Sequence, residues 1–264
     1  MLTLLEKLYG PRETKARATF DKLLAFQTAG LDVEAKLVGK SARNWIQVEI
    51  SGSESTIVTN YLRKRFGLTL SLPDVRTTTV LTGKVIDSKT VGYGVYVDVG
   101  LSVSSPLDVL IPLYRLRSHL VDGKKLPLRK IIDLFCLHDN FPLSIRLIGL
   151  DTENKKFGGE LSDTQIKRFR DWLSESLDRI IVLGTHHEQL KIALRKSGIR
   201  RDVASIEELG FLEYALLCKL GSDAPGIIKV LGPYLPKVPL YTFSPRKIDS
   251  ALGGFPCWLR LADL

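Results

Sequence analysis

Apolar and polar side chains alternate most regularly in the middle of the chain. In residues 94–99 three valines are separated by Tyr96 and Asp98, and this period of two predicts a strand with one buried face. Gly92 and Gly94 permit a tight turn or a bulge beside that strand. The valines are therefore expected to face a core, while the opposite face displays aromatic side chains.

Further strands are predicted on both sides of this one. The runs Gly83-Lys84-Val85 and Val109-Leu110-Ile111 are rich in β-branched residues. Residues 141–151 alternate apolar and polar positions, residues 152–156 form a polar turn, and residues 156–162 form a closing strand. The centre of the chain is therefore predicted to be a β-rich unit.

The order of glycines, aromatics and β-branched residues over residues 80–162 resembles an S1 motif. This resemblance implies a five-stranded barrel of the OB type that binds single-stranded RNA, with Tyr93 and Tyr96 as base-stacking residues. Stacking of a base on an aromatic ring contributes about 1–3 kcal/mol. The alternative is that both tyrosines only fill a pleated surface. The chain departs from the motif at Pro112, where many S1 motifs have a histidine, and in residues 119–138, which are longer than the minimal motif.

The first seventy residues follow the order β-α-β-β-α, which predicts a small α/β sandwich. The hairpin is expected to turn at Gly39-Lys40, and Gly67 is expected to cap the second helix. Residues 71–74 resemble a linker into the barrel. The expected strand, helix, hairpin and second helix cover residues 2–8, 13–28, 31–38 with 44–51, and 57–66.

After residue 161 the pattern changes to a helical period. Capping signals begin at Ser162, Thr185 and Ser205, and the last of these is expected to precede a short turn. The order β-α-β-α-β, with one more short strand near residues 202–204, predicts a ferredoxin-like half-open sandwich. The expected elements after the first helix are a strand, a helix, a strand, a helix and a strand over residues 179–183, 190–197, 211–220, 223–231 and 238–243.

The fold class is therefore α+β, with three small domains. These are an N-terminal α/β domain over residues 1–72, an S1-like OB barrel over residues 75–161, and a connecting helix with a ferredoxin-like α/β domain over residues 162–264. A chain of 264 residues with 44% hydrophobic residues can bury more than one core.

Composition indicates a cytoplasmic protein with no membrane partner. No apolar run approaches the roughly 18 residues that span a bilayer, and charge appears too early at the N-terminus for a signal peptide. The three cysteines, Cys136, Cys218 and Cys257, are scattered and contain no Cys-x-x-Cys pair. Neither a disulfide framework nor a zinc ribbon is expected.

Charge points to a polyanionic partner. The chain has 38 Lys and Arg against 29 Asp and Glu, a formal net charge of +9, which supplies a sequence-independent attraction to phosphates. The cations occur in clusters, each of which could also be a solvated helix face. The cations expected to contact RNA phosphates are Arg115, Arg117, Arg146, Lys155 and Lys156, with Lys124 and Lys125 beside them.

No catalytic or metal-binding signature is found. His186 and His187 are adjacent, so on a helix they point about 100° apart and do not form a metal pair. Residues 221–226 lack the Gly-x-x-x-x-Gly-Lys pattern of a nucleotide-binding loop. The spacing of the barrel carboxylates Asp98, Asp108 and Asp151 does not bring two of them together. We therefore expect a non-catalytic protein without cofactor or metal.

At the scale of the whole chain, residues 201–224 and the run Phe243-Ser244-Pro245-Arg246 are similar to segments of an uncharacterised archaeal protein family with an S1-like middle. The resemblance implies an archaeal, cytoplasmic origin. The favoured interpretation is a non-catalytic RNA-binding factor of translation that acts on the ribosome. The alternatives are an interaction module of the transcription machinery, by analogy with the polymerase stalk, and an accessory subunit of an RNA-processing enzyme.

Overall fold

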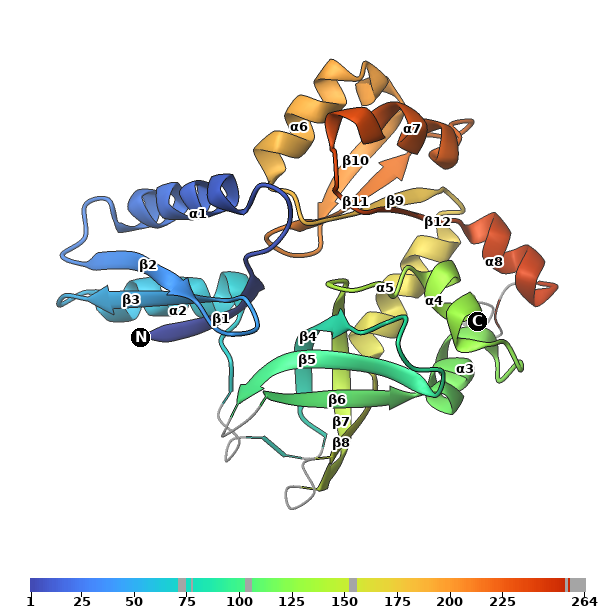
Figure 1. The fold of residues 1–264 in the computed structure, drawn as a ribbon, viewed down its shortest axis with the longest axis horizontal. Helices are drawn as coiled ribbons and strands as arrows, with labels where there is room; N and C mark the ends of the chain where they lie inside the picture. The colour runs from blue at the N-terminus through green and yellow to red at the C-terminus, as the bar shows by residue number, and fades with distance from the viewer. Residues whose placement is uncertain (71–74, 77, 103–105, 152–155, 255, 257–264) are drawn as a thin grey trace.

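Three lobes make up the molecule (Figure 1). The computed structural model describes residues 1–70, 75–76, 78–102, 106–151, 156–254 and 256. The predicted linker at residues 71–74, the position of Lys155 and that of Cys257 lie outside these residues. The chain is a mixed α+β protein, and among the described residues no helix combines the length and apolarity needed to cross a bilayer.

The N-terminal lobe has the expected order β-α-β-β-α. Its three strands pair antiparallel in the order β1-β3-β2, and its helices meet through Phe20 and Phe66, whose ring centroids are 5.5 Å apart. Gly67 ends the second helix with a φ of 72°, as predicted. Gly39 and Lys40, which we expected in the hairpin turn, belong instead to a strand. The elements are β1 (Leu2–Lys7), α1 (Glu13–Thr28), β2 (Glu34–Lys40), β3 (Trp45–Ser51) and α2 (Ser55–Phe66).

The central lobe is a closed five-stranded barrel with the strand order β4-β5-β6-β8-β7. Strands β6 and β8 pair in parallel, and the other neighbours pair antiparallel. A Cβ on Gly83 would lie 2.4 Å from the Asp98 carbonyl oxygen, so the close approach of β4 and β5 requires glycine there. The strands are β4 (Val80–Ile86), β5 (Gly94–Ser102), β6 (Pro106–Pro112), β7 (Pro142–Asp151) and β8 (Lys156–Leu161).

The long segment between the third and fourth barrel strands forms two helices that the sequence analysis did not assign. These are α3 (Leu113–Val121) and α4 (Leu128–Phe135). Helix α4 buries Ile131, Ile132 and Phe135 in the core of the barrel. The extra length is therefore an ordered cover of one barrel end, which Figure 1 shows beside α8.

The C-terminal lobe follows α5 (Asp163–Ser174) and contains a four-stranded antiparallel sheet in the order β10-β11-β9-β12. Residues 205–208, which we expected to form a capping signal before a short turn, are part of β10 and pair with β11. Pro245 begins a last helix, which was not predicted. The elements after α5 are β9 (Arg179–Leu183), α6 (His187–Lys196), β10 (Val203–Glu208), β11 (Glu213–Cys218), α7 (Ala224–Leu231), β12 (Leu240–Phe243) and α8 (Pro245–Leu252).

Of the helix caps predicted at Ser162 and Thr185, the first forms and the second does not. The Ser162 hydroxyl accepts a hydrogen bond from the Gln165 backbone N–H, as the capping signal predicts. Helix α6 is capped by His186, whose Nδ1 accepts from the Gln189 backbone N–H at 3.4 Å, and not by Thr185. The imidazole replaces the hydroxyl because it reaches the same unpaired N–H of the first helical turn.

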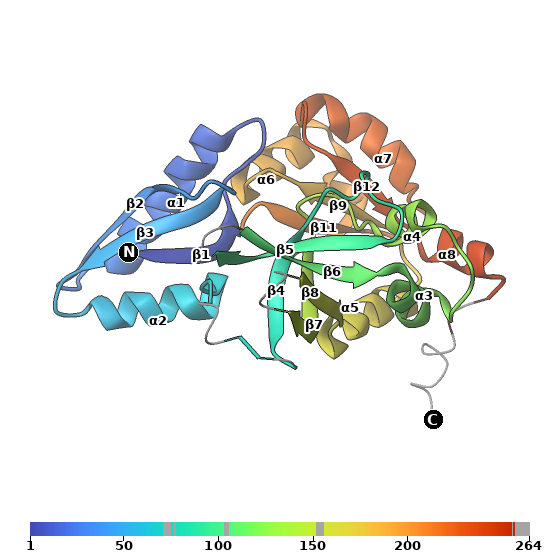
Figure 2. The same ribbon diagram turned by 60° about the horizontal axis from the view of Figure 1, so that its bottom comes forward.

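The lobes share side chains across their boundaries. Phe169 and Trp172 of α5 pack in the barrel core together with Phe243 of β12. Leu212, from the connection between β10 and β11, packs in the core of the N-terminal lobe. Figure 2 shows β1 beside β5, where the N-terminal lobe meets the barrel. The relative placement of the three lobes is therefore set by buried apolar contacts.

Candidate nucleic-acid interface

Tyr93 and Tyr96, the two residues predicted to stack on bases, lie together at one end of the barrel. Tyr96 projects from β5 on the side opposite the buried Val95 and Val97, and Tyr93 directly precedes the strand. The tyrosine hydroxyls are 2.9 Å apart and the rings meet edge to face. This hydrogen bond raises the pKa of Tyr96. The Tyr93 side chain is 55% exposed, which leaves ring surface open to a stacking partner.

The next part of the β5 surface is covered by the N-terminal lobe. Lys7 Nζ lies 2.7 Å from Asp98 Oδ2, and the Trp45 indole Nε1 donates to Asp98 Oδ1 at 3.2 Å. Arg43 connects Asp98 to Asp108, the residue opposite it on β6. The fold thus brings together two carboxylates whose spacing did not indicate it, and two cations, Lys7 and Arg43, neutralise them.

Arg115 and Arg146, both predicted to contact phosphates, are paired with carboxylates. Arg115 Nη1 lies 2.5 Å from Glu160 Oε2, and Arg146 Nη1 lies 3.5 Å from Glu160 Oε1. Arg146 also pairs with Asp163. Lys156 is the first residue of β8. An RNA phosphate would have to compete with these carboxylates for the two arginines.

The remaining predicted cations lie near the connection between α3 and α4. The Lys124 ammonium donates to the carbonyl oxygen of Leu252 at the end of α8, and Lys125 is exposed. Arg117 Nε donates to the Leu126 carbonyl oxygen at 2.9 Å. Among the predicted site residues whose side chains the structure describes, Arg117 alone lines the groove described next.

A groove of about 880 Å³ opens between the barrel and the C-terminal lobe. Its walls come from the β4–β5 connection, α3, α4, β12 and α8. We call it the basic groove, since among its described lining residues four cations stand against one carboxylate, Asp133. The four cations are Lys89, Arg117, Arg129 and Lys247.

Three of these cations lack an ion-pair partner among the described residues. Lys89, Arg129 and Lys247 are exposed, and none forms an ion pair with a carboxylate in the part of the chain that the structure describes. This distinguishes them from Arg115 and Arg146, which share Glu160. The basic groove therefore concentrates positive charge that is free to meet an anion.

The floor of the basic groove is aromatic and apolar. The His138 and Tyr241 rings stack with centroids 3.7 Å apart and planes 15° apart, and Ile132 lies beside them. Burial lowers the pKa of His138, which keeps the imidazole neutral at pH 7. His138 Nδ1 and the Ser88 hydroxyl are buried and have no hydrogen-bond partner among the described residues. The groove thus combines a cationic rim with a floor suited to a planar ring.

Sequence reasoning missed most of this groove. Arg129 follows the predicted cations Lys124 and Lys125, and His138 closes the long segment after the third barrel strand. Lys89, Tyr241 and Lys247 gave no signal because each is an isolated residue in a different segment. A strand or helix period identifies neighbours within an element, whereas this groove is assembled from five elements.

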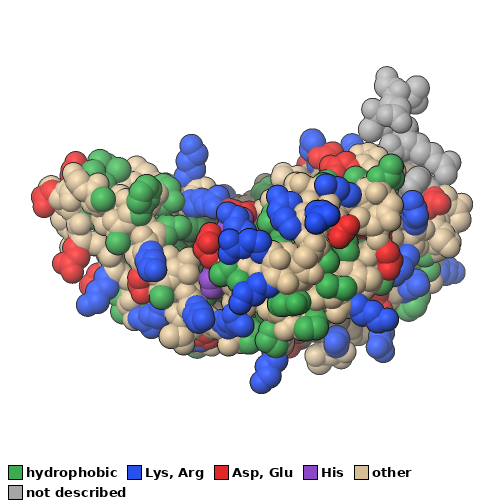
Figure 3. Space-filling view, turned by 90° about the horizontal axis from the view of Figure 1, so that it is seen from above, with side chains coloured by type: hydrophobic (Ala, Val, Ile, Leu, Met, Phe, Trp, Pro, Cys, Tyr) green, Lys and Arg blue, Asp and Glu red, His purple; other side chains and the backbone are tan. Residues whose placement is uncertain are grey.

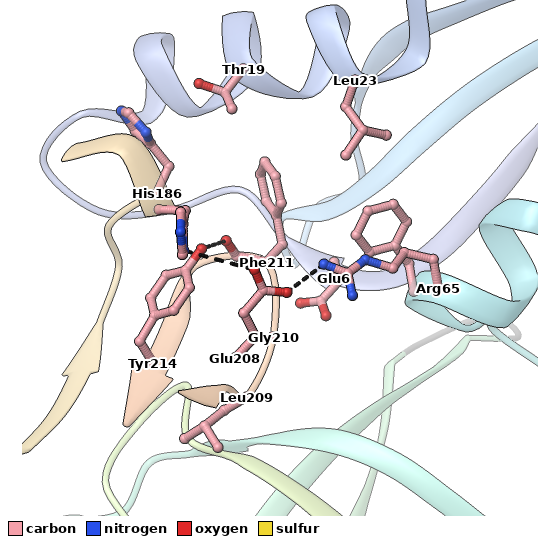
Figure 4. A pocket seen from close by; sticks show the side chains of 12 residues that line it. Glu6, Thr19, Leu23, Arg65, His186, Glu208, Leu209, Gly210, Phe211 and Tyr214 are labelled. Atoms are coloured by element: carbon pink, nitrogen blue, oxygen red, sulfur yellow. Dashed lines mark hydrogen bonds and ion pairs between the residues drawn. The ribbon is translucent and has the colours of Figure 1, made fainter. Parts of the chain in front are cut away.

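A second hollow, of about 230 Å³, lies between the N-terminal and C-terminal lobes. Figure 3 shows the molecule hollowed between these lobes, with lysine and arginine side chains gathered nearby. In Figure 4 Arg65 pairs with Glu208, and the Tyr214 hydroxyl donates to the Phe211 carbonyl oxygen at 3.0 Å. His187 Nδ1 lies 3.8 Å from Glu208 Oε1. Among the described lining residues two carboxylates, Glu6 and Glu208, stand against one arginine, Arg65, so this hollow lacks the positive excess of the basic groove.

The histidine pair does not form a metal site with other side chains. His186 caps α6, and His187 lies against the Tyr214 ring with centroids 5.6 Å apart. Within the described part of the chain, no group of three or more His, Cys, Asp or Glu side chains is placed to hold a metal ion. Cys136 and Cys218 are buried free thiols, and burial raises the pKa of Cys218 to about 11.

Comparisons with known proteins identify a family. No curated protein matches the chain. An uncharacterized protein from Methanocaldococcus jannaschii is 13% identical, with a TM-score of 0.23, over 34% of this chain and 96% of that one. A Streptococcus pneumoniae protein described as multidomain with nucleic acid binding domains is 10% identical, with a TM-score of 0.22; the match covers 84% of this chain and 52% of that protein.

Family models match along most of the chain. Residues 1–71 match the N-terminal domain of the DUF2110 family, residues 75–173 its central domain and residues 177–239 its C-terminal domain. The three matches follow one another in the order of the family's own domains. The chain therefore belongs to the DUF2110 family.

Proposed function

We propose that this protein is a non-catalytic factor that binds single-stranded RNA in the basic groove and on the adjacent Tyr93. The observation that carries the proposal is the convergence on one groove of Lys89, Arg129 and Lys247, which form no ion pair with any described residue. Unpaired cations attract phosphates without regard to sequence, and stacking on aromatic rings tolerates any base. Val91 and Gly92 line the groove and directly precede Tyr93, which connects the two parts of the surface.

The strand orders support finer fold assignments within this proposal. Closure of the barrel in the order β4-β5-β6-β8-β7, with one parallel pair, agrees with an S1-like OB barrel. The succession β9-α6-β10-β11-α7-β12 with sheet order β10-β11-β9-β12 agrees with a ferredoxin-like domain. Barrels of the OB type use their outer strand faces for nucleic acid. Here the N-terminal lobe contacts Asp98 on that face, so we assign the RNA to the Tyr93 end.

A charge-matched pair of variants tests the proposal. The groove variant replaces Lys89, Arg129 and Lys247 by Ala, and the control variant replaces the exposed Lys22, Lys196 and Lys229 by Ala. Both lose three positive charges, so they differ only in where the charge is lost. Fluorescence anisotropy with a labelled single-stranded oligoribonucleotide should show about tenfold or greater weakening for the groove variant and about twofold for the control.

Stacking is tested separately with Tyr93→Ala and the double change Tyr93→Ala, Tyr96→Ala. Loss of one stacked base should weaken binding by about 5- to 100-fold in the same assay. Equal affinities of wild type and the double variant would remove the stacking role and leave the electrostatic one. Equal weakening by the two charge variants would remove the basic groove from the proposal.

A further inference from the structure

We infer that the floor of the basic groove is a pocket for one unstacked nucleotide of the bound RNA. The inference rests on the proposed function and adds what the groove recognises. It starts from the arrangement of the lining: cations at the mouth, a stacked ring pair below, and two buried polar atoms that have no hydrogen-bond partner among the described residues.

The size and the floor of the groove suit a nucleotide. About 880 Å³ falls within the range of pockets that enclose small organic ligands, roughly 300–1,000 Å³. Tyr241 is half-buried and lines the groove, with His138 stacked beneath it at 3.7 Å. A nucleobase is planar and aromatic, so it can extend this stack. Ile132 and Leu113 supply the apolar surroundings.

Two lining atoms require hydrogen-bond partners. Ser88 is 5% exposed and His138 is 6% exposed, and both line the groove. The Ser88 hydroxyl and His138 Nδ1 have no partner among the described residues. Buried polar groups are nearly always hydrogen-bonded, so two such atoms in one pocket point to a ligand that supplies the partners. The edge of a nucleobase carries donors and acceptors side by side.

The cations fit the phosphates that flank such a base. Lys89 comes from the β4–β5 connection, Arg129 from α4 and Lys247 from α8, so the three charges approach from different elements. A mononucleotide places its phosphate a fixed distance from its base, and a continuous strand leaves the groove toward Tyr93. The pocket should therefore take a nucleoside monophosphate more tightly than either a nucleoside or inorganic phosphate.

Titration calorimetry of the full chain tests this with the four nucleoside 5′-monophosphates, the corresponding nucleosides and inorganic phosphate. Binding of at least one monophosphate should be about tenfold or more tighter than binding of phosphate or of its nucleoside. Ser88→Ala should weaken that binding about 2- to 10-fold, since it removes one hydrogen bond. Tyr234→Ala, at an exposed tyrosine outside the groove, should leave it unchanged. Thermal unfolding confirms that each variant is folded.

The outcomes separate this inference from the proposed function. Displacement of the monophosphate by the oligoribonucleotide would support both, because it places RNA in the same pocket. Salt-sensitive RNA binding without any monophosphate binding would overturn the pocket and leave the RNA-binding function. Monophosphate binding without RNA binding would keep the pocket and overturn the function. Binding no tighter than that of inorganic phosphate, or unaffected by Ser88→Ala, would overturn the nucleotide assignment.

Discussion

Lys84 is a buried lysine at the meeting point of the three lobes. Its Nζ lies 2.9 Å from Glu6 Oε2 of the N-terminal lobe and 2.6 Å from Glu213 Oε2 of the C-terminal lobe. The Tyr9 hydroxyl donates to Glu213 Oε1 at 2.7 Å. Two buried carboxylates thus share one ammonium group. Burial is the main cause that raises the pKa of Glu6 to about 7, and repulsion by the Glu213 carboxylate adds to it.

Removal of this ammonium should destabilise the protein strongly. Lys84→Met leaves Glu6 and Glu213 buried without a cation, a loss that costs about 3–5 kcal/mol of unfolding free energy. Lys229→Met, at an exposed lysine on α7, should change it by less than about 0.5 kcal/mol. Urea denaturation measures both. A Lys84→Met protein as stable as the Lys229→Met control would contradict the role of Lys84 as the common partner.

Glu6 also makes stability depend on pH. Its pKa in the folded state, about 7, lies above the ordinary value of 4.5, so the folded protein holds this proton more tightly than the unfolded chain does. The resulting stabilisation is complete below pH 4.5 and is lost as the pH rises through 7. Between pH 5 and pH 8 the titration of Glu6 should lower the free energy of unfolding by about 2–3 kcal/mol.

The matched measurement compares wild type with Glu6→Gln by urea denaturation from pH 5 to pH 8. Glutamine keeps the shape but does not titrate, so its unfolding free energy should fall less over this range. Parallel curves for the two proteins would show that Glu6 titrates at an ordinary pKa in the folded state.

Which residues could be predicted depended on the sequence distance between partners. Gly67 and Ser162 act within one turn of their own helices, and both were predicted correctly. Lys84 looked like an ordinary strand residue, since Glu213 lies 129 positions away. The predicted cap of α6 was wrong because His186, and not Thr185, is the N-cap residue.

Among the elements, the connection between β10 and β11 carries aromatic and apolar contacts that join the outer lobes. Phe211 meets Phe20 and Phe66 edge to face, with centroids 5.3 Å and 6.1 Å away. Leu212 is 1% exposed and lies in the core of the N-terminal lobe. A Cβ on Gly210 would lie 2.1 Å from Glu213 Oε2, so a larger residue there would have to displace this carboxylate.

A truncation in this connection should therefore loosen a lobe that is distant in sequence. Leu212→Ala leaves a cavity in the N-terminal core and should lower the free energy of unfolding by about 2–5 kcal/mol. Amide hydrogen exchange should show the largest loss of protection in α1 and β3, although the change lies in the C-terminal domain. Leu220→Ala, at a side chain that is 82% exposed, is the control. If hydrogen exchange became faster in β10 and β11 alone, Leu212 would not stabilise the N-terminal lobe.

Elements with a clear period were predicted well, and those shaped by tertiary contacts were not. The helix over residues 13–28 and the strand over residues 179–183 have the predicted bounds. Strand β10 was partly read as a helix cap because it is an edge strand of mixed polarity, and its pairing with β11 determines its conformation. Helix α4 is an exception, since it was not assigned although Leu128, Ile131, Ile132 and Phe135 follow the i, i+3, i+4, i+7 spacing of a helix.

At the scale of the whole molecule, lobe packing creates the groove that we propose as the RNA site. The net charge of +9 indicated a polyanionic partner, but it could not show which cations converge. The fold pairs Arg115 and Arg146 with Glu160, whereas Lys89, Arg129 and Lys247 surround one groove and form no ion pair within the described part of the chain. Convergence of this kind follows from domain placement, which hydrophobic periodicity within single elements does not encode.

The salt dependence of RNA affinity tests the central claim most directly. For single-stranded nucleic acid, each phosphate neutralised by a cation contributes about 0.7 to the slope of log K against log salt concentration. We predict that wild type and the Lys22, Lys196, Lys229 control share one slope, and that the Lys89, Arg129, Lys247 variant has a slope smaller by about 2. Affinity without salt dependence, or an equal slope for the two charge variants, would contradict RNA binding in the basic groove.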